Sequence, residues 1–420
     1  MTKLASFPNN PRRVVLFGLA AGAAQMAGCG GGGGGLAGIG SGGTGSFTTG
    51  VITGLGSIIV NGVRYSDDTA EKIALDDSTA RALIPGMVVA IEGSAVTPST
   101  TGGLPTATAY RIVYGSEWKG PVSSVDVPNK RFVILNQGVD VLSSTAIVGS
   151  VNQLANLIAG THYVEVYGFV DPATSRLQAS FIEVKTEQPS AYKLSGQISN
   201  IDTVNRTAQF GTSGSLIAIN WDSSARLPDG FSASSNGNFV RLVFDAARVS
   251  GSNYPVTRIR LPSSPLSDLS RHADYEAEIE GTVTSFTSVT VFSVNGIPVN
   301  AANAISTGGR LQAGSRVEVK GRIENAQMLA TRIEIKSAQS DESEDFEFHG
   351  SIVSSASGSF TLRPKNASDS TRDQSFTYDG NTEFDDGLTS ASLTVGAGRY
   401  EVKAVRLGAG FLATVIKLDD

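Results

Sequence analysis

Few residues of this 420-residue chain have the type and spacing that chemistry at a site requires. The one cysteine, Cys29, has no partner for a disulfide or a paired metal motif, and the sequence contains no G-x-S-x-G elbow. The histidines His162, His272 and His349 lie far apart and outside any zinc-binding motif. We therefore expect no enzyme, no catalytic residue, no cofactor and no metal site. His162, next to Tyr163 on an alternating strand, is interpreted as a structural histidine.

The densest charge is the acidic run Asp341–Glu347, whose oxygen atoms would suit a calcium ion. It lacks the ordered spacing and the central glycine of a calcium loop. We interpret it as a solvated linker between two repeated units. The pairs Asp67-Asp68, Asp76-Asp77 and Asp385-Asp386 fall in expected loops, so they are weak candidates for acid–base chemistry.

Three aromatic residues, Tyr110, Tyr114 and Trp118, cluster near the end of the first repeated unit. They are the candidate ligand-binding residues, since exposed rings can stack on sugars or bases. The competing interpretation, which we favour, is that they pack at a junction between domains. The net charge of −6 leaves no basic footprint, so we expect no nucleic-acid partner.

The N-terminus predicts export. Residues 1–28 combine early positive charges with the short apolar run Val14–Ala24, as a signal peptide does. The sequence Met26-Ala27-Gly28-Cys29 resembles a bacterial lipobox, with Met26 where leucine is usual. We therefore expect lipidation of Cys29, although an ordinary secretory signal followed by a chance cysteine is the alternative.

Lipidation would attach the chain to a membrane through its N-terminus. Gly30 after the cysteine, by the same resemblance, favours the outer membrane of a Gram-negative cell, with the protein facing the periplasm or the cell surface. Residues 29–46 are rich in glycine and predict a flexible tether.

The elements that follow the tether repeat. An alternating, strand-like segment recurs every 70 to 83 residues, at Ala107–Ile112, Leu177–Val184, Val256–Leu261, Leu329–Ile335 and Leu412–Leu418. Each unit also opens with a strand at a glycine, namely Gly50, Gly120, Gly196, Gly281 and Gly350. The residues that recur are Gly, Val, Ile and Thr, and the arginines Arg111, Arg258 and Arg332 are the only polar residues that recur in the closing strands. We expect the charged residues of these strands to form a solvated face.

Two further landmarks specify the local structure. Asn61-Gly62 and Asn295-Gly296 each separate two apolar runs, which is typical of a hairpin with a type I′ turn. A Leu-x-x-Gly sequence followed by an alternating strand appears at Leu83–Gly93 and Leu311–Gly321.

Five or six strands in about 70 residues favour closure into a small barrel, because an open sheet would leave bare edges. The predicted fold is all-β, with about five tandem OB-like barrels and a flattened sandwich as the alternative. The expected β-domains are residues 47–118, 119–190, 191–270, 271–340 and 341–420, of which the third and fifth are divergent.

Four features together carry a resemblance to a known family. The lipobox-like sequence, the glycine tether, the start Gly50-Val51-Ile52-Thr53-Gly54-Leu55-Gly56-Ser57-Ile58-Ile59-Val60-Asn61-Gly62 and the strand Gly86–Gly93 are similar to the bacterial domain-of-unknown-function 5666 family. The resemblance is strongest in units one and two and weakest in three and five. It implies exported proteins built from tandem OB-like units, and it supplies no catalytic or binding residues.

The expected function is therefore a non-enzymatic envelope lipoprotein that acts as a structural or binding module. The alternative is a protein that binds a glycan or another envelope polymer through loops or joints of its barrels. A polysaccharide or an envelope protein is the possible partner in addition to the membrane.

Overall fold

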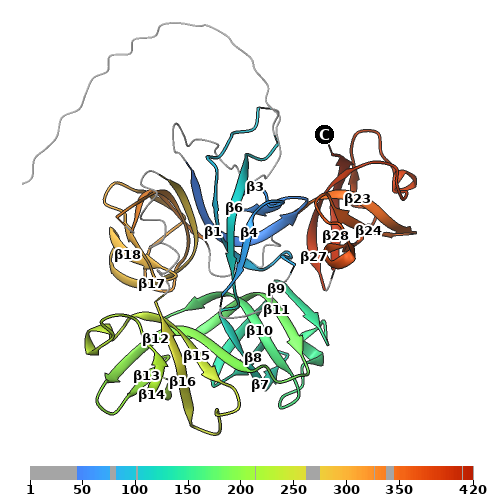
Figure 1. The fold of residues 1–420 in the computed structure, drawn as a ribbon. Coiled ribbons are helices and arrows are strands. Elements are labelled where there is room, and N and C mark those ends of the chain that lie inside the picture. The colour runs from blue at the N-terminus through green and yellow to red at the C-terminus, as the bar shows by residue number, and fades with distance from the viewer. Residues whose placement is uncertain are drawn as a thin grey trace, which may run out of the picture. The chain divides into compact units, whose positions relative to one another are not determined.

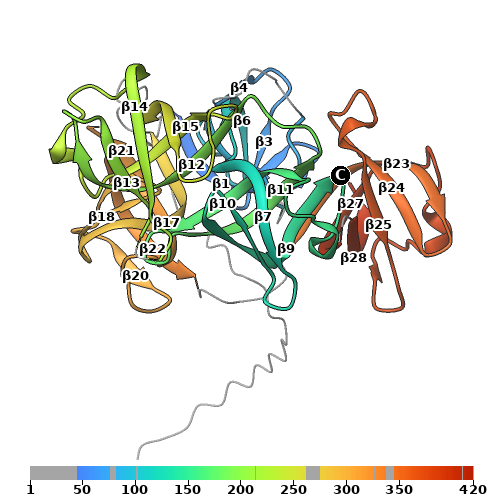
Figure 2. The same ribbon diagram turned by 90° about the horizontal axis from the view of Figure 1, so that it is seen from below.

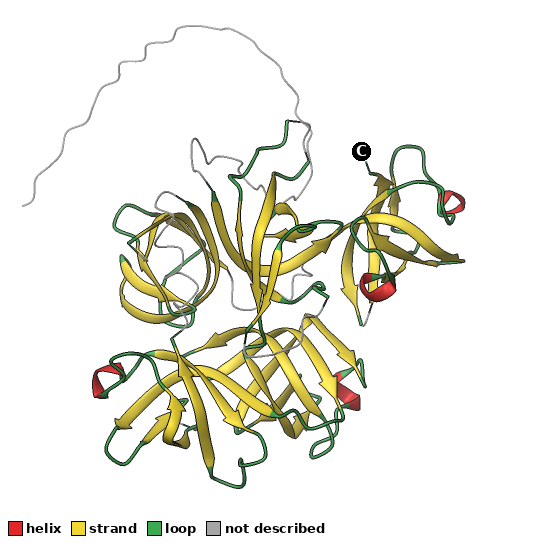
Figure 3. Ribbon diagram, in the orientation of Figure 1, coloured by secondary structure: helices red, strands yellow, loops and turns green. Residues whose placement is uncertain are grey.

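The computed structural model describes residues 45–75, 82–100, 103–212, 214–261, 275–325, 327–336, 345–408 and 410–419. In this part of the chain, regular structure consists of β-strands and four short 3-10 helices (Figures 1 and 3). The predicted all-β class is confirmed. The signal peptide, Cys29, His272 and most of the tether lie outside the described residues. No helix among the described residues is long and apolar enough to cross a membrane.

The strands form consecutive groups that share one pairing pattern. The β1–β6 barrel contains β1 (Ser46–Leu55), β2 (Ile58–Val60), β3 (Val63–Ser66), β4 (Glu71–Ala74), β5 (Val88–Gly93) and β6 (Thr106–Tyr114). The β7–β11 barrel contains β7 (Trp118–Asp126), β8 (Arg131–Ile134), β9 (Gln137–Gly149), β10 (Tyr163–Asp171) and β11 (Arg176–Lys185). The β12–β16 barrel contains β12 (Ala191–Asp202), β13 (Thr207–Phe210), β14 (Ile217–Arg226), β15 (Phe239–Asp245) and β16 (Tyr254–Arg260).

Two more barrels follow along the chain. The β17–β22 barrel contains β17 (Glu276–Ser288), β18 (Val291–Val294), β19 (Ile297–Asn300), β20 (Ile305–Thr307), β21 (Arg316–Glu324) and β22 (Gln327–Lys336). The β23–β28 barrel contains β23 (Phe346–Ala356), β24 (Ser359–Pro364), β25 (Gln374–Thr377), β26 (Glu383–Phe384), β27 (Tyr400–Leu407) and β28 (Gly410–Leu418), which Figure 2 shows together in orange and red. The number and limits of the β-domains proposed from the sequence remain predictions.

The β7–β11 barrel shows how each group closes. Strand β7 pairs with β8, and β8 with β9, both antiparallel. Strand β9 then runs parallel to β11, β11 pairs antiparallel with β10, and β10 returns to β7. The resulting strand order, 1-2-3-5-4-1, is a closed five-stranded OB-like barrel, as predicted; the flattened sandwich does not form.

The same order recurs in the other groups, with one variation. In the β1–β6, β17–β22 and β23–β28 barrels, two short strands share the place of the third strand and both pair parallel with the last strand. Figure 1 looks along the barrel that contains β17 and β18, where the ribbon closes into a ring.

The recurring opening glycine and the Asn-Gly turn have one physical explanation. Asn61 and Asn295 have φ angles of 50° and 49°, and the glycine after each is also positive, as a type I′ turn requires. A Cβ atom at Gly50 would lie 2.3 Å from the Asn61 side chain, and one at Gly281 would lie 2.2 Å from that of Asn295. The missing side chain on the opening strand therefore makes room for the turn asparagine.

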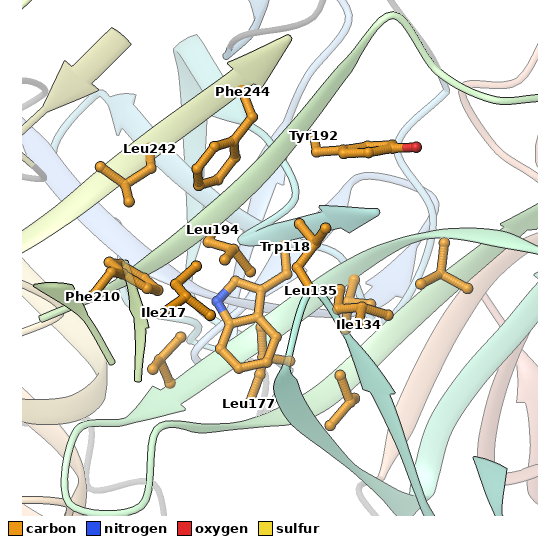
Figure 4. Packing of buried hydrophobic residues seen from close by; sticks show 14 of the residues in the cluster. Trp118, Ile134, Leu135, Leu177, Tyr192, Leu194, Phe210, Ile217, Leu242 and Phe244 are labelled. Carbon is orange, nitrogen blue, oxygen red and sulfur yellow. The ribbon is translucent and has the colours of Figure 1, made fainter. Parts of the chain in front are cut away.

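Buried apolar residues form the barrel interiors and also extend between neighbouring barrels. One cluster is continuous through the β7–β11 and β12–β16 barrels. Trp118 of β7 lies inside it, near Leu194 of β12 and Ile217 of β14 (Figure 4). Pairing also crosses between barrels, because β1 runs parallel to β17 over Ser46–Thr49 and to β23 over Gly54–Leu55.

Candidate functional site

A glutamate recurs at one position of three barrels. The opening-strand glycines Gly120, Gly281 and Gly350 are paired with Val164, Val317 and Tyr400 on the fourth strand of their barrels. The residue that follows on the fourth strand is a glutamate each time, namely Glu165, Glu318 or Glu401. Because the strand register is the same, these three side chains occupy equivalent positions on the outer face of their barrels.

A second glutamate accompanies the first. It lies three residues before the opening glycine, at Glu117, Glu278 and Glu347. Glu278 and Glu347 lie in β17 and β23, where the alternation of side chains along a strand places them on the same outer face as the fourth-strand glutamate. Glu117 immediately precedes β7. The other two barrels differ: the β1–β6 barrel has Phe47 and Ala90 at these positions, and the β12–β16 barrel has Lys193 and Arg241. We call the three pairs of glutamates the carboxylate pairs.

The sequence interpretation that arginines of the closing strands are the only recurring polar residues is therefore wrong. The signal is present in the sequence as Glu-x-x-Gly at Glu117–Gly120, Glu278–Gly281 and Glu347–Gly350. It becomes visible only when the units are aligned on the opening glycine, because the fourth-strand glutamate lies 40 to 54 residues farther along each unit. The expectation of a solvated charged face also fails at these positions, since Glu165 is 3% exposed.

In the β7–β11 barrel, two lysines hold Glu165. Its Oε1 atom lies 2.9 Å from Nζ of Lys119 on β7 and 2.8 Å from Nζ of Lys185 on β11. Burial by itself raises the pKa of Glu165, but the hydrogen bonds and attraction of the two lysines outweigh it and lower the pKa to about 2. The carboxylate is thus firmly ionised and neutralised.

In the β17–β22 barrel, the two carboxyl groups share a proton. Burial, followed by repulsion from Glu318 and a hydrogen bond to it, raises the pKa of Glu278 to about 8. Burial also acts on Glu318, but its hydrogen bonds with Glu278 and Lys336 and the attraction of the lysines lower its pKa to about 2. Lys320 lies between them, with Nζ 3.0 Å from Glu278 Oε1 and 3.1 Å from Glu318 Oε1. Burial and mutual repulsion thus favour a pair that holds one proton at neutral pH.

In the β23–β28 barrel, the carboxylate pair includes a histidine. His349 faces Glu401 across the strands, and its Nε2 atom lies 2.8 Å from Glu347 Oε1. Its Nδ1 atom lies 2.8 Å from Asp419 Oδ1. Lys417 Nζ lies 3.0 Å from Glu401 Oε1. Burial lowers the pKa of Lys417, but its hydrogen bond and attraction to Glu401 raise it on balance.

Each carboxylate pair also meets a neighbouring barrel. Arg241 of β15 forms an ion pair with Glu117, and Arg64 of β3 forms one with Glu347 at 3.1 Å. Beside Glu278, β17 pairs with β1, and the Val51 N–H of β1 donates to the Glu280 carboxylate at 3.4 Å. The three barrels with carboxylate pairs thus contact the two barrels that lack them.

The three aromatic residues predicted to bind a ligand differ in their exposure to solvent. Trp118 is 1% exposed, and its Nε1–H donates to the Ser195 carbonyl at 2.8 Å. Tyr114 is 3% exposed, whereas Tyr110 is 53% exposed. Only Tyr110 presents an open ring, so the three residues do not form a shared stacking platform. Trp118 packs at the junction of β7 and β12, in agreement with the competing interpretation.

Two other predictions can be compared with the structure. His162 is buried, and its Nδ1 atom accepts a hydrogen bond from the Ile158 N–H at 2.9 Å, as expected of a structural histidine. Of the acidic run, Phe346 and Glu347 belong to β23, and Glu347 is part of a carboxylate pair. The linker interpretation is therefore wrong for those two residues, and Asp341–Glu344 lie outside the described residues.

The chemistry available to the carboxylate pairs is mainly electrostatic. Their cationic partners lie within ion-pair distance, and in the parts of the chain described above no cysteine lies beside them. One pair also contains a possible metal-ligand set, because ligand atoms of Glu347, His349 and Glu401 all lie within 4.8 Å of one another. The search for sequence motifs missed this set, because Glu347 and Glu401 lie on two strands and are 54 residues apart in the sequence.

Three segments of the chain match the family described as Domain of unknown function (DUF5666), at residues 119–183, 280–334 and 349–417. The resemblance stated from the sequence is confirmed for these segments. The matches fall on the three barrels with carboxylate pairs, and they include Glu165, Glu318 and Glu401. They extend to the last unit, where we expected a weak resemblance, and they do not include the first, where we expected a strong one.

The remaining comparisons add little. No significant match to a curated protein was found. A solved structure described as drosophila Unr CSD456 is 12% identical, with 56% of this chain and 98% of that chain covered and a TM-score of 0.14. The assignment of the barrel fold therefore rests on the strand pairings above.

Proposed function

We propose that this protein is a non-enzymatic cell-envelope lipoprotein whose repeated barrels act as a structural module. The observation that carries the proposal is that the recurring carboxylates are held by lysine or arginine residues of their own or a neighbouring barrel. A catalytic carboxylate needs access to a substrate and a pKa matched to its task. Glu165, which is almost fully buried and has a pKa of about 2, has neither.

Turnover measurements test the absence of catalysis. The purified chain is incubated with peptidoglycan, lipopolysaccharide and neutral polysaccharides, and soluble products are sought by mass spectrometry. We expect none. Product formation that a folded Glu165→Gln, Glu318→Gln or Glu401→Gln variant abolishes would show instead that the carboxylate pairs are catalytic.

The anchor is proposed from the lipobox-like sequence before Cys29. The full chain should fractionate with the outer membrane of a Gram-negative host and carry acyl chains on Cys29. The variant Cys29→Ser should appear in the soluble periplasmic fraction. Retention of this variant in the membrane fraction would remove the lipid anchor from the proposal.

A glycan-binding function is the second candidate, and the exposed ring of Tyr110 is the observation that favours it. Pull-down on immobilised envelope polysaccharides tests it. Binding that Tyr110→Ala abolishes and Trp118→Phe preserves would support this function over a purely structural one, because Trp118 is enclosed. Equal binding by the two variants would exclude Tyr110 as the platform.

A further inference from the structure

The β23–β28 barrel holds a set of ligands that the other two carboxylate pairs lack. The residue before the opening glycine is Lys119 in β7 and Glu280 in β17, but it is His349 in β23. An imidazole nitrogen and two carboxylates, those of Glu347 and Glu401, therefore face one point, with all ligand atoms within 4.8 Å of one another. This combination of nitrogen and oxygen ligands suits zinc and related divalent transition metals.

The histidine is oriented as a metal ligand would be. Asp419 Oδ1 lies 2.8 Å from Nδ1, which directs Nε2 towards Glu347. A carboxylate bonded to the far nitrogen commonly fixes the tautomer and ring orientation of a ligating histidine. The backbone of the β1–β2 turn also holds the residue in place: Gly56 has a φ of 116°, and a Cβ atom there would lie 2.5 Å from Cβ of His349. His349 itself is 1% exposed.

A protein cation occupies the point at which the ligands converge. Nη2 of Arg64 lies 2.5 Å from His349 Nε2 and 3.1 Å from Glu347 Oε1. The Arg64 side chain is 26% exposed, and the Lys417 side chain on Glu401 is 36% exposed. Both cations are partly exposed, so water can solvate them if another cation replaces them.

We propose that Glu347, His349 and Glu401 form a binding site for a divalent ion of the zinc class, which competes with the guanidinium group of Arg64. One divalent ion neutralises the two carboxylates, so Arg64 and Lys417 are no longer required for charge balance. Because Arg64 belongs to the β1–β6 barrel, metal binding and this contact between barrels exclude each other. The proposal is independent of the structural function proposed above.

Metal titration of the full-length chain tests the site directly. The chain carries Cys29→Ser, so that the thiol binds no metal, and has no polyhistidine tag. Co²⁺ is added first, because visible absorption bands report nitrogen and oxygen coordination, and Zn²⁺ affinity is then measured against a chromophoric chelator. Circular dichroism and thermal unfolding confirm that each variant is folded.

The variant Arg64→Ala should bind one Zn²⁺ per chain, about tenfold or more tightly than the chain that retains Arg64, which is a usual size for linked binding. Adding Glu401→Gln, which keeps the side-chain shape, or His349→Ala should abolish the gain. His162→Ala is the matched control for a buried histidine elsewhere and should retain it. The proposal is overturned if Arg64→Ala does not strengthen binding, or if the gain survives in folded Glu401→Gln and His349→Ala variants.

Discussion

The β7–β11 and β23–β28 barrels carry equivalent carboxylate pairs, but they differ in the residue immediately before the opening glycine, which is Lys119 in one and His349 in the other. In the first barrel Lys119 pairs with Glu165 and completes a neutral, enclosed cluster. In the second, His349 takes that place and leaves Glu401 to a half-exposed lysine and Glu347 to an arginine of another barrel. The comparison shows that one position of a repeated fold can be purely structural in one copy and suited to a ligand in another.

The largest expected effect concerns the core residue that the two barrels share two positions before the glycine, Trp118 and Phe348. Each is almost fully enclosed, so Trp118→Ala and Phe348→Ala should each lower the free energy of unfolding by about 3–5 kcal/mol. Denaturant unfolding measures this. Tyr110→Ala, on the exposed ring, is the control and should change stability by less than about 0.5 kcal/mol. Equal losses in all three variants would contradict the assigned burial.

The carboxylate pair of the β17–β22 barrel should make the stability of the chain depend on pH. Glu278 has its pKa raised to about 8 in the folded chain, above the ordinary value of 4.5, so the folded state binds one more proton than the unfolded state between these values. Stability should therefore fall by up to about 1.4 kcal/mol per pH unit as pH rises from about 5 to 8.

Unfolding of the wild-type chain and of Glu278→Gln, measured over this pH range, tests the prediction. The variant cannot lose the proton, so its stability should vary less with pH. A wild-type chain whose stability rises between pH 5 and 8 would show that Glu278 is ionised in the folded state.

A smaller difference in stability is expected between alanine variants of the two fourth-strand glutamates, Glu165 and Glu401. Glu165→Ala removes the partner of the enclosed Lys119 ammonium group and should cost about 1–3 kcal/mol. Glu401→Ala should cost less, since Lys417 is already half-exposed and can be solvated. Thermal unfolding of both variants measures the difference, and a larger loss in Glu401→Ala would reverse the assignment of structural and ligand-like roles.

The smallest effect is expected from the substitution that makes the two barrels alike. His349→Lys places an ammonium group opposite Glu401, as Lys119 lies opposite Glu165. We expect this variant to unfold within about 1 kcal/mol of the wild type, because the new ammonium group has the Glu401 carboxylate opposite it. A loss as large as that of Phe348→Ala would mean that the surroundings of His349 accept no other side chain.

The barrel fold followed from local signals in the sequence. Asn61-Gly62 and the alternating strands specify turns and faces within a few residues, and these features are confirmed in the structure. The carboxylate pairs depend on strand register instead. Glu165 lies opposite Lys119 only because Gly120 is paired with Val164, and no single segment contains that relation.

The ion pairs of Arg241 and Arg64 were even harder to predict from the sequence than the carboxylate pairs. Each arginine lies in a barrel that lacks the carboxylate pair, and its partner belongs to a different repeat, at Glu117 or Glu347. Periodicity within one repeat carries no information about such pairs. From the sequence, burial of Trp118 at a domain junction is the favoured interpretation of the aromatic cluster, but an exposed platform remains the alternative because the residue types alone fit both.

The central claim is that the carboxylate pairs join the barrels that match the family to the barrels that do not. A double-mutant cycle on Glu117 and Arg241 tests it most directly, using Glu117→Gln, Arg241→Ala and the double variant in denaturant unfolding. We predict a coupling energy of about 0.5–3 kcal/mol, the range of residues in direct contact. A coupling energy near zero would contradict the account.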